Sequence, residues 1–179
     1  MNITTVIQNL KRGNHSTFKD VVYSYSEILM TIAKIYTRNK ADAEDVLQDS
    51  FISIYRNIHQ FNGEEEKAFV GWMKKIVTNT ALSKYKKKHY SNEKYTLESN
   101  SPQTQTPSVL KQYEYEELMN AVYNLPIKYK RIVGLYAING YSHVEIAELL
   151  DIQPSSSRSI YSRATTMLFN ALSPKMKIV

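Results

Sequence analysis

The sequence of 179 residues contains no cysteine, only five glycines and five prolines, and a single tryptophan. Without cysteine the chain forms no disulfide and no cysteine-ligated metal site, which suits a reducing compartment. No stretch approaches the roughly 18 consecutive apolar residues that a membrane span needs. The first ten residues also lack the cationic flank and apolar run of an export signal. We therefore expect a cytoplasmic protein that is not inserted in a membrane.

Acidic residues are absent from two long segments of a chain whose net charge is +6. Residues 67–92 and residues 152–179 contain no Asp or Glu, and both carry several lysines or arginines. The acidic residues gather instead at 42–45 and 64–66. Cationic segments gain affinity for polyanions by releasing counterions from phosphates. The two basic segments therefore point to a nucleic-acid partner.

The scarcity of glycine and proline, together with helical apolar periodicity and no convincing strand alternation, favours an all-α fold. Residues 99–108, SNSPQTQTPS, have no apolar side chain except proline and cannot offset the entropy of ordering. We predict two small helical domains, 1–92 and 113–179, joined by a flexible linker at 93–112. The expected helices span residues 3–10, 14–37, 42–58, 65–87, 114–123, 126–138 and 144–150, and a last helix starts at Pro154.

The end of the chain has the pattern of a helix-turn-helix. Ser142 and Glu145 have the spacing of a capping box, in which each side chain bonds the other's backbone N–H. The helix that they start is short, and a tight turn at 151–153 follows it. Pro154 then occupies a first helical position, where its missing N–H costs nothing. His143, inside the capping box, is expected to be simply exposed.

The last helix divides into two faces at about 100° per residue. The side expected to face the core carries Ser157, Ile160, Ala164, Met167, Leu168 and Ala171. The opposite side is short, polar and cationic, and five serines in eight residues are a poor choice for mere solubility because serine is a mediocre helix former. Small hydroxyl side chains allow a helix to approach the major groove, and arginine bonds guanine edges or phosphates. The predicted DNA contacts are Ser155, Ser156, Arg158, Ser159, Ser162 and Arg163.

The third and fourth helices also have distinct faces. In the third, the expected core stripe is Ala43, Leu47, Phe51, Ile54 and Ile58, and aspartates project nearly opposite. Such an acidic face is either a solvated surface or a surface that binds a basic protein, and it repels DNA. In the fourth helix, the expected buried residues are Phe69, Met73, Ile76 and Thr80.

These segments resemble a known family. Residues 142–164 resemble region four of the extracytoplasmic-function (ECF) sigma factors, within the sigma-70 family. Residues 42–51 resemble the polymerase-binding helix of that family, and residues 69–79 resemble its helix that reads and opens the minus-ten element. The sequence departs from the family pattern where Ser83 replaces an aspartate, lysines replace the arginines that follow, and Asp151 stands at a usual glycine.

The resemblance implies a protein that binds core RNA polymerase and promoter DNA, and an anti-sigma factor is a common further partner in this family. It implies that 1–92 is region 2 and that 113–179 is region 4, with the last helix in the minus-thirty-five element. The implied polymerase-binding residues are Asp42, Asp45, Gln48, Asp49 and Ile52. The candidate minus-ten contacts are Trp72, Lys75, Asn79, Lys84, Lys86 and Lys87, because basic residues track a melted strand.

Two alternatives remain open on the residues alone. A conventional helix-turn-helix regulator would bind an operator as a dimer, although the 42–51 motif and the linker argue against it. An enzyme is a remote option, because no phosphate loop or nucleophile motif is present. The four histidines, His15, His59, His89 and His143, have no metal-ligand spacing. We expect no catalytic residues, no metal and no cofactor.

Overall fold

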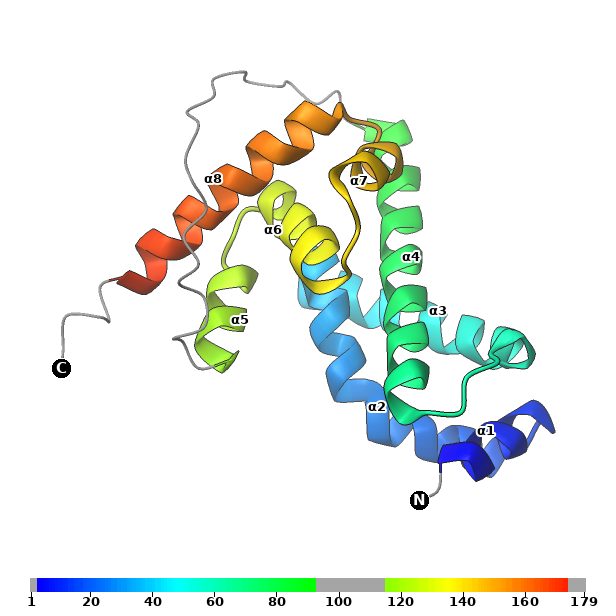
Figure 1. The fold of residues 1–179 in the computed structure, drawn as a ribbon. Helices are drawn as coiled ribbons and strands as arrows, with labels where there is room; N and C mark the ends of the chain where they lie inside the picture. The colour runs from blue at the N-terminus through cyan, green and yellow to red at the C-terminus, as the bar shows by residue number, and fades with distance from the viewer. Residues whose placement is uncertain (1–2, 93–114, 174–179) are drawn as a thin grey trace, which may run out of the picture. The chain divides into compact units, whose positions relative to one another are not determined.

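The computed structural model describes residues 3–92 and 115–173, without the side chains of residues 87–92. In these ranges every regular element is helical and no strand occurs, which confirms the predicted all-α fold (Figure 1). None of these helices is long and apolar enough to cross a membrane. Contacts divide the chain into two compact units, Met1–Asn92 and Glu93–Val179. The predicted flexible linker, 93–112, lies outside the described residues.

The first unit is built from α1 (Ile3–Lys11), α2 (His15–Tyr36), α3 (Lys40–Asn57), the 3-10 turn η1 (Ile58–Gln60) and α4 (Glu66–Asn92). Helices α2, α3 and α4 pack against one another in all three pairs, and α1 contacts α2 and η1. Asn14 caps α2, since its side-chain oxygen accepts from the Thr17 N–H at 3.0 Å. Asn39 caps helix α3, because its side-chain oxygen accepts a hydrogen bond from the Asp42 N–H. The predicted cap, Asp42, therefore lies three residues after the true cap.

The buried residues of the first unit agree with the prediction for α3, and for α4 they agree only in part. Every member of the α3 stripe from Ala43 to Ile58 is buried, which confirms that face. In α4, Phe69 and Met73 are buried, but Ile76 and Thr80 are only half-buried. Both α2 and α3 pack on α4, so its buried face is wider than one stripe and rotated from the predicted one. The other buried residues of α4 are Val77, Thr78, Ala81 and Leu82.

The second unit contains α5 (Tyr115–Tyr123), α6 (Ile127–Val133), the π-helical turn η3 (Gly134–Ile138), α7 (His143–Leu150) and α8 (Pro154–Leu172). The helix predicted over 126–138 is therefore two segments, because the Asn139 N–H bonds the Gly134 carbonyl five residues back at 3.0 Å. Helix α8 contacts α5, α6 and α7 (Figure 1). It is the element on which the other helices of this unit converge.

The buried side of α8 is narrower than the sequence predicted. Ser157, Ala164, Leu168 and Leu172 form the buried stripe, whereas Met167 is 38% exposed and Ala171 is exposed. Met167 lies about a quarter turn from Leu168 on a helix of 3.6 residues per turn. The predicted placement of Met167 and Ala171 in the core was therefore wrong, and Leu172 was missed.

Two glycines near the start of α4 make a matched pair for testing this packing. A Cβ added at Gly63 would lie 2.5 Å from the Phe61 Cζ, and the Phe61 ring is held between Phe69 and Trp72 at centroid distances of 5.4 and 5.3 Å. We expect Gly63→Ala to lower the free energy of unfolding by about 1–3 kcal/mol, as overpacking does. Gly71 has nothing within 4 Å and lies in a helix, so Gly71→Ala should raise that free energy by about 1 kcal/mol. Urea unfolding of both variants measures the difference, and equal effects would contradict it.

Candidate functional site

The helix-turn-helix of α7 and α8 has the predicted local geometry. The Glu145 N–H donates to the Ser142 Oγ at 3.3 Å, and the Ser142 N–H donates to the Glu145 carboxylate at 2.7 Å. This reciprocal pair confirms the capping box. The turn is closed by Asp151, whose φ of 55° and ψ of 51° are left-handed. Pro154 is confirmed at the start of α8.

The outward face of α8 carries short polar side chains and one exposed arginine, Arg158. Ser155 and Arg158 are exposed, and Ser156, Ser159, Ser162 and Arg163 are half-buried. The guanidinium of an exposed arginine presents a planar fork of donors, and short neighbours leave it room to reach a base edge. The structure thus brings all six predicted residues onto one helix of the second unit.

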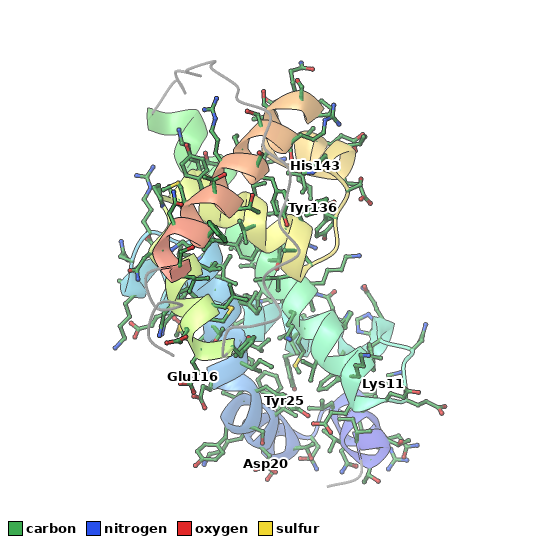
Figure 2. All side chains as sticks on the ribbon, turned by 60° about the vertical axis from the view of Figure 1, so that its left-hand side comes forward. Lys11, Asp20, Tyr25, Glu116, Tyr136 and His143 are labelled. Carbon is green, nitrogen blue, oxygen red and sulfur yellow. The ribbon has the colours of Figure 1, made fainter. Side chains whose placement is uncertain are left out.

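His143 has a structural role that the sequence did not reveal. It is half-buried, and its Nδ1 lies 2.9 Å from the Oγ of Ser157, which is fully buried in α8. Its ring stacks on Tyr136, with centroids 4.3 Å apart and an interplanar angle of 12° (Figure 2). Tyr161 approaches both rings, at 5.9 Å from His143 and 4.5 Å from Tyr136. His143 therefore ties η3 and the two helices of the motif together.

Burial, and then the nearby charge of Arg158, lower the pKa of His143. The folded protein therefore binds fewer protons here than the unfolded chain does, whose histidine has a pKa of about 6.5. We expect this histidine's contribution to stability to be complete above that pH and to be lost as the pH falls toward its lower folded value. Thermal unfolding midpoints of the wild type and His143→Gln between pH 8 and pH 5 measure the effect. The wild type should lose more stability in acid than the variant, and parallel pH profiles would contradict the prediction.

An open groove of about 640 Å³ lies beside this cluster. Tyr136, Tyr141 and His143 line one part of it, and Glu145 and Arg158 line another. The groove therefore connects the start of α7 with the outward face of α8. Hydroxyl, imidazole and guanidinium groups in one groove supply the donors that phosphate and base edges accept.

The outward face of α3 combines acidic and apolar area, as the sequence predicted. Asp45, Gln48 and Asp49 are exposed, and Asp42 is half-buried at the first turn. Ile52 is 44% exposed, which makes it the large apolar side chain of this face. An exposed apolar side chain one turn beyond Gln48 and Asp49 suits a protein surface that is basic and partly apolar.

Lys84 of α4 reaches this acidic face. Its ammonium lies 2.5 Å from an Asp45 carboxylate oxygen and 2.6 Å from an Asp49 carboxylate oxygen. It also donates to the Asp45 backbone carbonyl at 3.2 Å. The structure therefore places this predicted DNA contact among the predicted polymerase-binding residues.

Three of the other predicted minus-ten residues lie along the outward side of α4. Lys75, Asn79 and Lys86 are exposed. Trp72 is half-buried and packs on Phe61 and Phe69, with centroids 5.3 and 6.0 Å away. The side chain of Lys87 lies outside the described residues. Trp72 is thus a packing residue of the first unit that remains partly accessible.

The first turn of α4 is fixed by a contact that sequence reasoning missed. The hydroxyl of Tyr25 in α2 donates to a Glu66 carboxylate oxygen at 3.0 Å, and its ring meets Phe69 edge-on at 6.0 Å (Tyr25 is labelled in Figure 2). Burial, followed by the bond to Glu66 and its charge, raises the pKa of Tyr25 to about 12. Glu66 therefore anchors the helix through this bond, although its side chain is exposed, as are those of Glu64 and Glu65 in the preceding loop.

The described residues contain no group of three or more His, Asp or Glu side chains placed to hold a metal ion. The candidate residues are arranged on the exposed faces of helices. This arrangement comprises a hydroxyl- and arginine-lined helix in the second unit, and an acidic helix beside a basic one in the first.

Family comparisons match both units. The sigma-70 region 2 family matches residues 21–90, and the sigma-70 region 4 family matches residues 115–168. The ECF RNA polymerase sigma-E factor of Haemophilus influenzae is 28% identical over 184 residues, covering 96% of this chain and 95% of the relative. The ECF RNA polymerase sigma factor SigW of Bacillus subtilis is 28% identical over 167 residues, covering 85% of this chain and 87% of the relative.

A solved structure, that of CnrH in complex with the cytosolic domain of CnrY, shares the fold. It matches with a TM-score of 0.50 and 18% identity, covering 97% of this chain and 99% of that chain. The two family matches follow one another in the chain in the order of regions 2 and 4.

Proposed function

Because this chain belongs to the ECF group of the sigma-70 family, we propose that it is a sigma subunit that directs core RNA polymerase to specific promoters. The single observation that carries the proposal is the presence of both regions in one chain. The first has an acidic helix face beside a basic one, and the second has a helix lined by hydroxyl groups and arginine. The protein is not an enzyme, and polymerase supplies the catalysis. Its place of action would be the cytoplasm.

In this proposal residues 1–92 act as region 2 and residues 113–179 act as region 4, with 93–112 as the flexible linker between them. Two weak contacts on one chain raise each other's effective concentration, so neither promoter element has to be bound tightly. We include an anti-sigma factor as a further partner, because such partners are common in this family.

In region 4, α8 would lie in the major groove of the minus-thirty-five element. Ser155, Ser156, Ser159 and Ser162 would allow close approach, and Arg158 and Arg163 would contact bases and phosphates. The support is that these side chains share the outward side of α8, opposite a buried stripe that holds the helix in place. Phosphate contacts orient such a helix, and base contacts specify the sequence.

In region 2, the outward face of α3 would bind polymerase through Asp42, Asp45, Gln48, Asp49 and Ile52. The outward side of α4 would contact the melted minus-ten strand through Trp72, Lys75, Asn79, Lys86 and Lys87. Lysines here act as point charges on phosphates, since lysine lacks the bidentate fork of arginine. Sequence preference at this element would therefore rest more on stacking and on Asn79 than on the lysines.

Reconstitution with core polymerase tests the function directly. The protein should co-purify with core polymerase, and the complex should give run-off transcripts of defined length from some genomic promoter fragments that core alone does not transcribe. Binding to an operator as a dimer without binding to core polymerase would favour the rival reading, a conventional helix-turn-helix regulator.

A further inference from the structure

A groove of about 370 Å³ lies between α3 and α4, and Ile76 contributes to its lining together with polar side chains. Asp49 and Ser53 of α3 line one side, and Asn79, Thr80 and Ser83 of α4 line the other. Lys84 also lines it, and this lysine joins the two helices. The groove therefore lies between the two surfaces for which the proposed function requires different partners, and one side chain connects them.

The ammonium of Lys84 is fully occupied by α3. A lysine ammonium has three N–H donors, and Lys84 has three oxygen acceptors within 3.2 Å: one from each of the Asp45 and Asp49 carboxylates and the Asp45 carbonyl. Burial alone lowers its pKa, but the hydrogen bonds and charges of the two aspartates outweigh burial, so the pKa is raised. Lys84 is thus charged and has no donor left for a phosphate.

Helix geometry separates Lys84 from its neighbours in the same basic segment. At about 100° per residue, Lys84 lies about 20° from the buried Val77, so it continues the buried stripe of α4 toward α3. Lys86 lies about 180° from Val77, and Lys75 and Asn79 each lie about 20° from Lys86. The exposed Lys75, Asn79 and Lys86 therefore share one side of α4 by helix geometry. Lys84 starts from the other side, although it lines the same groove as Asn79.

We propose that Lys84 is a positioning residue that joins the polymerase-binding helix to the minus-ten helix, and not a DNA contact. The proposal rests on the proposed function and revises the role of Lys84, which the sequence predicted to be a minus-ten contact. Lys84 holds the C-terminal half of α4 against α3. It also offsets one of the three carboxylate charges of the face made by Asp42, Asp45 and Asp49, so a partner meets two net negative charges instead of three.

The salt dependence of promoter binding distinguishes a bridge from a phosphate contact. Each lysine that neutralises a phosphate of a melted strand adds roughly 0.7 to the slope of log affinity against log salt. Polymerase reconstituted with the Lys84→Met variant should bind promoter DNA with the wild-type slope, even if its affinity is lower. The matched Lys86→Met variant should lose about 0.7 of the slope. A loss at Lys84→Met equal to that at Lys86→Met would overturn the proposal.

Thermal unfolding of the full chain supplies a second measurement that needs no DNA. The variants are Lys84→Met, Asp49→Asn and the two combined, at low ionic strength. If the bridge exists, the combined variant should lower the unfolding midpoint by clearly less than the sum of the two single losses, because the second change removes a partner already lost. If the loss of the combined variant equals the sum of the two single losses, the proposed ion bridge between Lys84 and Asp49 is wrong. If Lys86→Met and Lys75→Met both leave the salt slope unchanged, the assignment of α4 to DNA fails, while this cycle still decides the role of Lys84.

Discussion

Replacing Arg158 with alanine should reduce transcription from the cognate promoter by about 5- to 150-fold while leaving binding to core polymerase unchanged. This range corresponds to the roughly 1–3 kcal/mol that a bidentate arginine–guanine contact contributes to discrimination. Arg158 is exposed on the outward side of α8, and its loss leaves no cavity in the core. Run-off transcription on matched promoters that differ only in the minus-thirty-five element measures the effect, because selectivity between them should shrink as well.

Two further variants separate recognition from charge. Arg158→Lys keeps the positive charge without the fork, so activity should recover only in part while selectivity stays low. Lys128→Ala removes one positive charge from an exposed position of α6 in the same unit and should leave selectivity intact. Unchanged promoter selectivity in Arg158→Ala would show that α8 does not read bases through this residue.

Replacing Ile52 with arginine should weaken binding to core polymerase by at least about tenfold, and transcription from every promoter should fall together. Ile52 is 44% exposed within the acidic face of α3, so the substitution removes apolar area and adds a charge of the same sign as a basic partner. An apolar anchor near the centre of an interface commonly contributes more than the polar residues around it, and like charges placed against each other cost several kcal/mol. Co-purification with core polymerase at increasing salt measures the loss.

Glu44 offers the matched control on the same helix. It is exposed, lies outside the predicted face and pairs only weakly with Lys40, at 3.6 Å. Glu44→Arg introduces the same residue as Ile52→Arg and should leave polymerase binding within about twofold, since surface pairs of this kind contribute little. Equal losses for both variants would mean that net charge, and not this face, governs the interaction.

The features that sequence reasoning found are those whose signals are local. The capping box of Ser142 and Glu145 and the position of Pro154 each depend on residues within four positions of one another, and backbone geometry then determines the outcome. The core stripe of α3 was found for the same reason, because one helix face packs against a continuous core. The division into two units was likewise predicted from a local signal, the polar composition of residues 99–108, and contacts divide the chain at Asn92.

The features that sequence reasoning missed depend on contacts between distant residues. Lys84 and Asp45 are 39 positions apart, and Tyr25 and Glu66 are 41 apart, so no local pattern links them. The link between His143 and Ser157 required the angle between α7 and α8, which the turn at Asp151 sets. One signal was available for Lys84: helical periodicity already placed it on the buried side of α4, away from Lys86, but the run of lysines obscured that difference.

The two sides of α8 also bear on how such a protein evolves. The residues that hold the helix in its unit, Ser157, Ala164, Leu168 and Leu172, are different from the outward residues that would meet DNA. A substitution at Ser155 or Arg158 alters the reading surface without disturbing the buried stripe, and exposed positions seldom affect stability by more than a few tenths of a kcal/mol. Promoter preference can therefore drift in small steps between duplicated copies of such a gene, each of which stays folded. New regulons can arise in this way without passing through an unstable intermediate.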